Sequence, residues 1–330
     1  MIPARGAGPL AGCRRPRRQF LLTLGLVLIP ACNREKKITV AVIPKGRAHM
    51  FWQSVHAGAS AASKQTGVEI IWNGPASETD YNGQIQIVDA MINRRVSAIA
   101  LAPIDKKAMV GVVERAARQG IPVIIFDSGI DTEQFVSQVA TDNYAAGELA
   151  AGRIGTLLGG KGKVVIVAVM PGAASTMARE LGFEEALAKK FPGISILDKR
   201  YGMADYAKSL AVTENLLTAH PDLDGIFASN ESSTVGASQA VKARQSKVKL
   251  VGFDWSPTLL EDLKSGTIDS LVVQHPFKMG YEAVLAAHKK LNGETLVKIN
   301  NLAPRLILRE DLDKPDVQAQ LNPDLKKYLE

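Results

Sequence analysis

From residue 37 onward, short apolar blocks alternate with longer blocks of mixed apolar and polar residues. Residues 38–43 form an apolar, β-branched run, which predicts a parallel strand covered on both faces. The next block, 51–65, has the length of a helix, and the same order then repeats. The predicted strands are 38–43, 68–72, 98–102, 122–126, 164–169, 194–197, 225–228, 248–253, 270–273 and 305–308. The predicted helices are 51–65, 80–93, 106–119, 142–158, 175–190, 206–219, 232–243, 257–264 and 278–291.

This alternation predicts an α/β fold with two lobes. Strands separated by helices of roughly 10–15 residues form βαβ units, which build parallel sheets covered by helices. One series ends near residue 126 and a second begins near residue 142, so we expect two doubly wound parallel-sheet lobes. No long Gly-, Ser- or Pro-rich linker separates them, which favours short hinge strands. Residues after 308 are polar and charged, and we expect them to wrap the surface.

Several predicted strands are followed by polar or aromatic residues. Ligands in open α/β sheets bind beyond the carboxyl ends of the strands, so these residues are candidates for a binding site. Planar Asp, Asn and Gln side chains can engage neighbouring sugar hydroxyls in pairs, and an aromatic ring can stack on the apolar face of a sugar. The residues at these positions are Lys45, Phe51, Trp52, Asp127, Asn230, Asp254, Trp255 and Gln274.

Each of these residues also has a purely structural interpretation. Asp127 could cap a turn, Asn230 could cap the next helix, and Phe51 and Trp52 could be core residues of the first helix. Their joint occurrence on strand after strand favours a binding site. Most of them cannot act as nucleophiles and no nucleophile–base pair is evident, which favours binding over catalysis.

Motifs of enzymes with this kind of fold are missing from the sequence. No G-x-G-x-x-G follows a predicted strand, and there is no G-x-S-x-G or H-E-x-x-H. Residues 155–162 (GTLLGGKG) come near a P-loop, but Gly162 replaces the hydroxyl residue that binds magnesium, and the loop ends a helix instead of opening one. The five histidines are scattered. We expect no catalytic activity, no metal and no cofactor.

The net charge of +7 hints at nucleic-acid binding, but the positive charges are concentrated near the N-terminus. Residues 1–31 hold five arginines and no acid, so the rest of the chain has 35 basic against 33 acidic residues. A body that is nearly neutral lacks the basic surface that nucleic-acid binding requires. We therefore expect no nucleic-acid partner.

The N-terminal segment predicts export. Residues 14–18 are basic and 20–29 are apolar, too short for a membrane span of roughly 20 residues, which predicts a signal peptide over 1–31. Residues 28–31 (LIPA) before Cys32 resemble a bacterial lipobox. That resemblance implies lipidation of Cys32, with 32–36 as the anchor linker. The alternative is an ordinary signal peptide with an incidental cysteine.

Residues 17–22 (RRQFLL) resemble a twin-arginine export motif, with a simple basic region as the alternative. Export by the twin-arginine route or by the general secretory (Sec) route would deliver the protein to the periplasm or the outer face of a membrane. The two cysteines, Cys13 and Cys32, lie outside any expected core, so no disulfide framework is expected.

Six short segments distributed over the mature chain match one known family. At these segments the chain resembles the periplasmic sugar-binding proteins of ABC transporters, of the ribose-binding type, over nearly its whole mature length. Sugar-responsive repressors share the fold but carry an N-terminal DNA-binding domain where this chain has an export leader. The segments are 120–127 (GIPVIIFD), 140–143 (ATDN), 178–183 (ARELGF), 215–221 (NLLTAHP), 251–254 (VGFD) and 273–274 (VQ).

This resemblance implies the type I periplasmic-binding-protein fold, with two lobes joined by a three-segment hinge near residues 142–143, 274–276 and 303–305. It implies a monomer that captures a sugar or polyol by hinge closure and delivers it to an ABC permease. The N-lobe would consist of residues 37–142 and 276–303, and the C-lobe of residues 143–275 and 304–330.

The resemblance also implies a role for each matching position. Phe51 and Trp52 match the aromatic plates of the N-lobe, and Asp127 matches the aspartate that accepts hydroxyl protons. Arg179 matches the C-lobe arginine that binds ring and hydroxyl oxygens. The remaining polar contacts of the C-lobe and hinge correspond to Asn230, Asp254 and Gln274.

Departures from the ribose-type pattern make ribose itself a poor candidate. Ser128 stands where the pattern has an arginine, and His49 stands where it has an asparagine. The C-lobe aromatic residue is missing, although Tyr206 is close to its place. Lys45 resembles the lysine of autoinducer-2 receptors, whose paired C-lobe acid and amide are not matched here. We therefore expect a different sugar or polyol, with further candidate contacts at Lys45, His49, Tyr206 and Trp255.

Two other functions stay open. One is a periplasmic receptor that serves a chemotaxis, histidine-kinase or autoinducer-2-type system, because the same fold serves sensors and permeases. The other is an enzyme built on this scaffold, for which the sequence offers no nucleophile–base pair.

Overall fold

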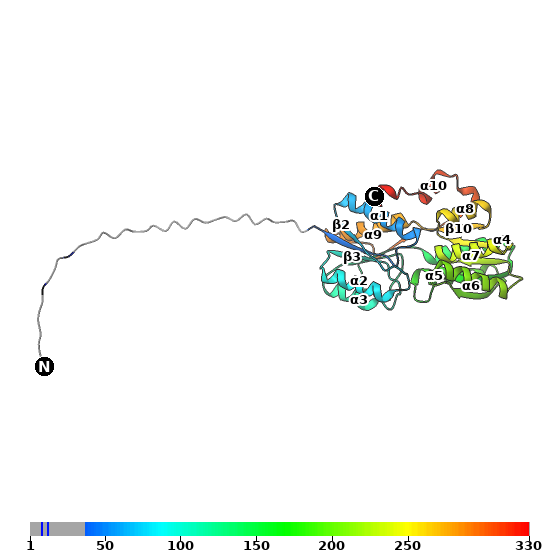
Figure 1. The fold of residues 1–330 in the computed structure, drawn as a ribbon, viewed down its shortest axis with the longest axis horizontal. Helices are drawn as coiled ribbons and strands as arrows, with labels where there is room; N and C mark the ends of the chain where they lie inside the picture. Colours follow the sequence, from blue (N-terminus) through cyan, green and yellow to red (C-terminus); the bar gives the residue numbers. More distant parts are fainter. Residues whose placement is uncertain (1–7, 9–11, 13–36, 330) are drawn as a thin grey trace, which may run out of the picture. The chain divides into compact units, whose positions relative to one another are not determined.

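Two six-stranded sheets form the framework of the protein (Figure 1). The structure, a computed structural model, describes residues 8, 12 and 37–329. The strands are β1 (Thr39–Ile43), β2 (Glu69–Trp72), β3 (Ala98–Leu101), β4 (Val123–Phe126), β5 (Ser137–Thr141), β6 (Lys161–Ala168), β7 (Gly193–Tyr201), β8 (Gly225–Ala228), β9 (Lys249–Phe253), β10 (Ser270–Val273), β11 (Ile299–Leu302) and β12 (Arg305–Leu308). The helices are α1 (Met50–Thr66), α2 (Tyr81–Asn93), α3 (Val110–Arg118), α4 (Asn143–Leu157), α5 (Ala174–Lys190), α6 (Tyr206–Ala219), α7 (Glu231–Ala243), α8 (Pro257–Ser265), α9 (Pro276–Leu291), α10 (Pro315–Leu321) and α11 (Lys326–Leu329), with a 3₁₀ turn at Arg309–Asp311.

The two sheets have equivalent strand orders and differ in the direction of one edge strand. The first has the strand order β11-β5-β4-β3-β1-β2, and the second has the order β12-β10-β9-β8-β6-β7. All pairs are parallel except β12, which runs antiparallel to β10. Central strands such as β4 and β8 are buried throughout, because helices cover both faces of each sheet. The predicted α/β fold with two doubly wound lobes is confirmed.

Residues of one strand alternate between the two faces of the N-lobe sheet. Val40 and Val42 pack with the apolar sides of α1 and α9, whereas Ala41 and Ile43 pack with α2 and α3. This period of two is the geometry of a strand, and it explains why nearly every position of β1 is apolar. Figure 1 shows α2 and α3 on one side of these strands, with α1 and α9 on the other.

The C-lobe sheet is covered in the same way. Val164 and Ile166 of β6 pack with the apolar faces of α4 and α5, and Val165 and Val167 pack with α6, α7 and α8. In both lobes the helices cover the faces of the sheet. Only loops and the starts of helices therefore lie at the carboxyl ends of the strands, where a ligand can approach.

The chain passes between the sheets three times. The passages lie between β5 and α4, between β10 and α9, and between β11 and β12. We propose that the lobe boundaries lie at these passages, with residues 37–142 and 276–303 in the N-lobe and residues 143–275 and 304–330 in the C-lobe. Short connections of this kind let two lobes rotate relative to one another while each sheet stays intact.

All predicted strands and helices occur, with ends shifted by a few residues, but β5 and β11 were not predicted. Ser137 and Gln138 in β5, and Asn300 and Asn301 in β11, interrupt the apolar run that marks the other strands. These two strands are held by their ladder, since β11 pairs with β5 from Gln138 to Thr141. Sequence periodicity indicates burial and not pairing between strands, so it does not predict strands of this kind.

The end of the chain departs from the expected surface tail. Val317 and Leu321 of α10 are fully buried in the C-lobe core, so the expectation is wrong for this helix. Helix α11 then contacts α1 of the N-lobe, where Lys64 donates a hydrogen bond to the Lys327 carbonyl at 2.9 Å. The predicted C-lobe range 304–330 therefore includes a segment whose contacts lie with the N-lobe.

The predicted signal peptide, the anchor linker and Cys32 lie outside the described residues. Within the part of the chain that the structure describes, no helix is long and apolar enough to span a membrane.

Glycines let one pair of helices cross closely in each lobe. A Cβ atom on Gly58 of α1 would lie 1.8 Å from the carbonyl oxygen of Phe277 in α9. In the C-lobe, a Cβ atom on Gly147 of α4 would lie 2.0 Å from the carbonyl oxygen of Arg179 in α5. The backbone contact at Gly147 therefore fixes the position of the helix that carries Arg179.

We predict that Gly147→Ala destabilises the protein by about 1–3 kcal/mol, because the added methyl group forces α4 and α5 apart. Gly152→Ala in the same helix is the matched control. A Cβ atom there meets nothing within 4 Å, and alanine should stabilise the helix by about 0.5–1 kcal/mol. Thermal or urea unfolding of both variants tests this. Equal stability of the two would contradict the close crossing.

Candidate functional site

Polar and aromatic side chains from both lobes meet at the carboxyl ends of the two sheets. All seven residues predicted as ligand contacts line one hollow there, together with Lys45 and His49. Of the other two candidates, Tyr206 packs edge-on against His49 beside the hollow, and Trp255 packs into the C-lobe core. The lining residues are Lys45, His49, Phe51, Trp52, Glu78, Asp127, Ser175, Thr176, Arg179, Asn230, Glu231, Asp254 and Gln274.

Four lining residues were not predicted: Glu78, Ser175, Thr176 and Glu231. Three of them follow the pattern that found the others, since Ser175 and Thr176 come after β6 and Glu231 comes after β8. Glu78 lies in the loop between β2 and α2, and no periodic pattern or motif marks it.

The hollow measures about 30 Å³, far below the roughly 300 Å³ of a typical ligand pocket. It is small because side chains from the two lobes bond with each other. Lys45 pairs with Asp127 at 2.7 Å and donates to the Ser175 hydroxyl of the opposite lobe at 3.0 Å. A ligand must exchange such contacts for its own.

Two aspartates occupy equivalent places in the two lobes. Asp127 follows β4 and Asp254 follows β9, and both have left-handed backbone conformations, with φ of 61° and 66°. Aspartate tolerates this conformation better than most residues, although it still carries strain. Strained backbone of this kind gathers at functional sites, where surrounding contacts hold it in place.

The hinge side of the hollow is a chain of hydrogen bonds between buried groups. The Thr141 hydroxyl donates to the side-chain oxygen Oε1 of Gln274 at 2.7 Å, and the side-chain amide Nε2 of Gln274 donates to Asp254 at 2.7 Å. The other carboxylate oxygen of Asp254 accepts from the backbone N–H of Glu231 at 3.0 Å. These bonds link the last residue of β5 in the N-lobe to the start of α7 in the C-lobe.

Arg179 is buried and held on three sides. Its Nε donates to Asn143 at 2.8 Å, its Nη1 donates to the Ser229 carbonyl at 2.9 Å, and its guanidinium lies 3.9 Å from the centre of the Phe253 ring. Burial lowers the pKa of Arg179, and the charge of Asp254 acts against this shift. An arginine stays protonated in proteins, so a fixed positive charge faces the hollow.

Some residues line the hollow and also stabilise the fold. Asn230 lines the hollow and caps α7 by accepting the Ser233 N–H at 2.9 Å. Phe51 and Trp52 belong to the N-lobe core and also line the hollow, with their rings perpendicular at a centroid distance of 4.8 Å. The structural and the functional interpretations of these residues are therefore compatible.

Glu78 holds two of the N-lobe residues that line the hollow. It pairs with Nδ1 of His49 at 2.7 Å and accepts the indole N–H of Trp52 at 2.8 Å. Burial lowers the pKa of His49, but the hydrogen bond and charge of Glu78, with the charges of Glu231 and Asp254, outweigh burial and raise it to about 9. His49 is therefore an imidazolium at neutral pH.

Burial also acts on Asp254 and raises its pKa to about 6. The charge of Arg179 and the hydrogen bond from Gln274 act against this shift, while the charge of Glu231 adds to it. Near neutral pH most of this carboxyl group is ionised and can accept hydrogen bonds from ligand hydroxyls.

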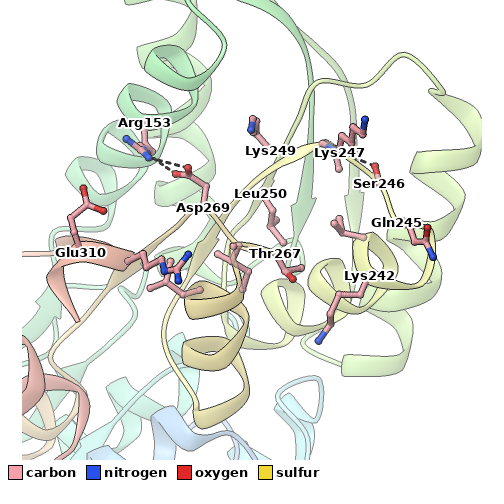
Figure 2. A pocket seen from close by; sticks show the side chains of 16 residues that line it. Arg153, Lys242, Gln245, Ser246, Lys247, Lys249, Leu250, Thr267, Asp269 and Glu310 are labelled. Atoms are coloured by element: carbon pink, nitrogen blue, oxygen red, sulfur yellow. Dashed lines mark hydrogen bonds and ion pairs between the residues drawn. The ribbon is translucent and has the colours of Figure 1, made fainter. Parts of the chain in front are cut away.

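A larger hollow of about 630 Å³ lies at the opposite end of the C-lobe sheet, around the starts of β9 and β10 (Figure 2). Three of its charged residues are paired, since Arg153 donates twice to Asp269, at 2.6 and 2.9 Å, and Lys242 pairs with Asp262 at 2.8 Å. No aromatic residue lines it. Of these two hollows, the one between the lobes is the better candidate site, because it joins aromatic residues with converging polar groups. Within the described residues, no group of three His, Cys, Asp or Glu side chains is placed to hold a metal ion.

The raised pKa of His49 predicts a pH-dependent contribution to stability. Protonated His49 stabilises the folded protein fully below pH 6.5, and this contribution is lost as the pH rises towards about 9. The difference in melting temperature between the wild type and His49→Gln should therefore shrink between pH 6.5 and 9. His220→Gln, at the C-cap of α6, is the control. A difference that stays constant over this range would contradict the His49–Glu78 ion pair.

Comparison with known proteins places this chain in one family. A family model described as "Periplasmic binding protein domain" matches residues 40–295. The chain is 30% identical to the ribose import binding protein of Bacillus subtilis over 291 residues, which covers 84% of this chain and 94% of that protein.

Solved structures agree with this match. A carbohydrate transporter solute-binding protein of Agrobacterium radiobacter, in complex with D-arabinose, has a TM-score of 0.84 and 34% identity, covering 87% of this chain and all of that one. An ABC transporter solute-binding protein of Agrobacterium vitis, with bound D-fucose, has a TM-score of 0.83 and 34% identity, covering 86% of this chain and all of that one. This chain belongs to the periplasmic binding protein family.

Proposed function

We propose that this protein binds a neutral sugar or sugar-like polyol between its lobes and delivers it to an ABC permease. The observation that carries the proposal is the hollow itself, where paired polar groups and two aromatic plates converge from both lobes. Its relatives are sugar-binding proteins of ABC transporters, and the chain is a binding protein and not an enzyme. The protein works outside the cytoplasm, as periplasmic binding proteins do.

The contacts that close the hollow are the kind that sugar hydroxyls can replace. A hydroxyl group both donates and accepts, so it can stand between Lys45 and Asp127, or between Gln274 and Asp254. Arg179 offers further N–H groups from the C-lobe side, and Phe51 and Trp52 offer ring faces from the N-lobe side. The ligand then keeps every buried polar group hydrogen-bonded while the lobes stay closed.

The charge of the hollow favours neutral ligands over acidic ones. With His49 protonated, three positive side chains face four negative ones, which leaves a net charge of −1. A uronic acid or sugar phosphate would add a further negative charge to a buried site and would lose its hydration there. The acids are Glu78, Asp127, Glu231 and Asp254, and the cations are Lys45, His49 and Arg179.

The lipid anchor, the monomeric state and the export route belong to the same proposal. Lipidation of Cys32 would hold a monomeric binding protein at the membrane and raise its local concentration near the permease. Export by the twin-arginine route would require folding before translocation. A receptor for a chemotaxis or autoinducer-2-type sensor is the second candidate, favoured by the placement of Lys45 inside the hollow beside Asp127.

We predict that Arg179→Ala and Asp254→Ala abolish ligand binding in a protein that still folds. Each variant removes a charged group that would meet the ligand directly. Isothermal titration calorimetry with circular dichroism tests this, and Arg179→Lys, which keeps the charge but loses the fork of donors, should bind weakly. Arg153→Ala, in the hollow at the far end of the C-lobe, is the control and should bind normally. Normal affinity in both alanine variants would refute the site.

A thermal-shift screen tests the ligand class. We expect neutral pentoses, hexoses or sugar alcohols to raise the melting temperature, with about 2.7 kcal/mol of stabilisation at 100 times the dissociation constant. Each sugar should be paired with its acidic counterpart, such as D-galactose with D-galacturonic acid. A stronger shift with the acidic member would overturn the charge argument, and a response to autoinducer-2 alone would favour the sensor.

A further inference from the structure

Two helices, one from each lobe, begin at the hollow. Helix α1 of the N-lobe starts at Met50, and α7 of the C-lobe starts at Glu231. The first N–H groups of a helix have no partner within the helix, and its N-terminus carries a partial positive charge. Closing the lobes brings these two N-termini together, so their orphan donors and like charges must be compensated.

Helix α1 has no cap of its own. The residue at its N-cap position, His49, makes no side-chain capping bond, and its imidazole is engaged by Glu78 instead. No acidic residue lies in the first turn of α1. In contrast, Asp80 and Asp142 cap their own helices, α2 and α4, with side-chain hydrogen bonds.

The missing cap of α1 comes from the opposite lobe. The Glu231 carboxylate accepts the backbone N–H of Met50 at 3.3 Å through Oε1, and that of Phe51 at 3.1 Å through Oε2. The Tyr206 hydroxyl donates to Oε1 at 2.8 Å. One buried carboxylate, 3% exposed, thus lies between the starts of two helices and compensates the positive ends of both.

The backbone of Glu231 is fixed independently of this contact. Its N–H donates to Asp254 at 3.0 Å, and Asn230 caps α7 through the Ser233 N–H at 2.9 Å. The Glu231 side chain is therefore not needed as the side-chain cap of its own helix. Both carboxylate oxygens are used on α1 and Tyr206, which distinguishes Glu231 from the lining residues whose contacts a sugar would replace.

We propose that Glu231, supported by Tyr206, is a positioning residue that latches the closed lobes by capping α1 across the hollow. The proposal rests on the proposed function, because closure around a ligand gives the latch its purpose. The capped helix carries Phe51 and Trp52, so the same contact that holds the lobes together also orients the aromatic plates. Tyr206 then acts through Glu231, and its hydroxyl is not required as a ligand contact.

The test compares Glu231→Ala, Glu231→Gln and Tyr206→Phe with the wild type. Loss of a helix cap corresponds to a change between about twofold and thirtyfold in an equilibrium constant. We expect Glu231→Ala to raise the dissociation constant by a factor in this range for every sugar that binds, mainly through faster dissociation measured by stopped flow. Glu231→Gln keeps the shape and one acceptor oxygen but loses the charge, so its effect should be intermediate. Tyr206→Phe should have the smallest effect.

A matched control variant and the ranking of sugars by affinity distinguish a latch from a direct ligand contact. Glu184→Gln removes a carboxylate that pairs with Lys199 on the surface of the C-lobe, and it should leave dissociation unchanged. A direct contact would change the ranking of sugars, whereas a latch weakens all of them by the same factor. An altered ranking, or unchanged dissociation in both Glu231 variants, would overturn the latch.

Small-angle X-ray scattering of the mature protein without ligand tests the latch independently of which sugar binds. The Glu231 variants should have a larger radius of gyration than the wild type, because the lobes open more often. If no sugar binds the wild type, the proposed ligand class fails, and the scattering comparison still decides the latch. Identical radii for wild type and both variants would then refute it.

Discussion

Buried polar groups must be hydrogen-bonded or paired, and this constraint shapes the region between the lobes. Parallel sheets gather polar side chains at the carboxyl ends of their strands, where each lobe alone cannot satisfy them. The two lobes satisfy each other, as Lys45 does with Ser175 and as Glu231 does with the start of α1. The closed arrangement is therefore stabilised by hydrogen bonds between polar groups that would bind water if the lobes were apart.

The same constraint explains how a sugar can compete with these contacts. A ligand with several hydroxyl groups can take over each broken bond, as donor to Asp127 and as acceptor from Lys45, so the exchange leaves few groups unpaired. We propose that the net gain then comes from the stacking surfaces of Phe51 and Trp52. Glu78 holds the Trp52 indole, and Glu231 caps the helix that carries both rings. A ligand without enough hydroxyl groups would leave buried charges uncompensated, which makes the hollow selective.

The sequence predicted the fold well because strands buried on both faces leave a clear apolar run, as in β1 and β4. It missed β5 and β11, which depend on pairing, and the buried apolar residues of α10, which lie within a mostly polar segment. The ligand-site prediction followed strand ends and family motifs, and the seven predicted contacts do lie together. Glu78 could not be found this way, because its role depends on a loop whose path only tertiary structure determines.

The two lobes share one framework and differ in the chemistry that they present. Helices α1 and α5 follow the equivalent strands β1 and β6, so both start at the hollow. Each of the two helices also crosses a neighbouring helix closely at a glycine. Helix α1 contributes the apolar rings of Phe51 and Trp52, whereas α5 contributes the guanidinium of Arg179. We propose that a sugar ring places its apolar face towards α1 and its polar edge towards α5. Selectivity then resides in the few residues by which two similar lobes differ, and we expect substitutions there to change the ligand without disturbing either sheet.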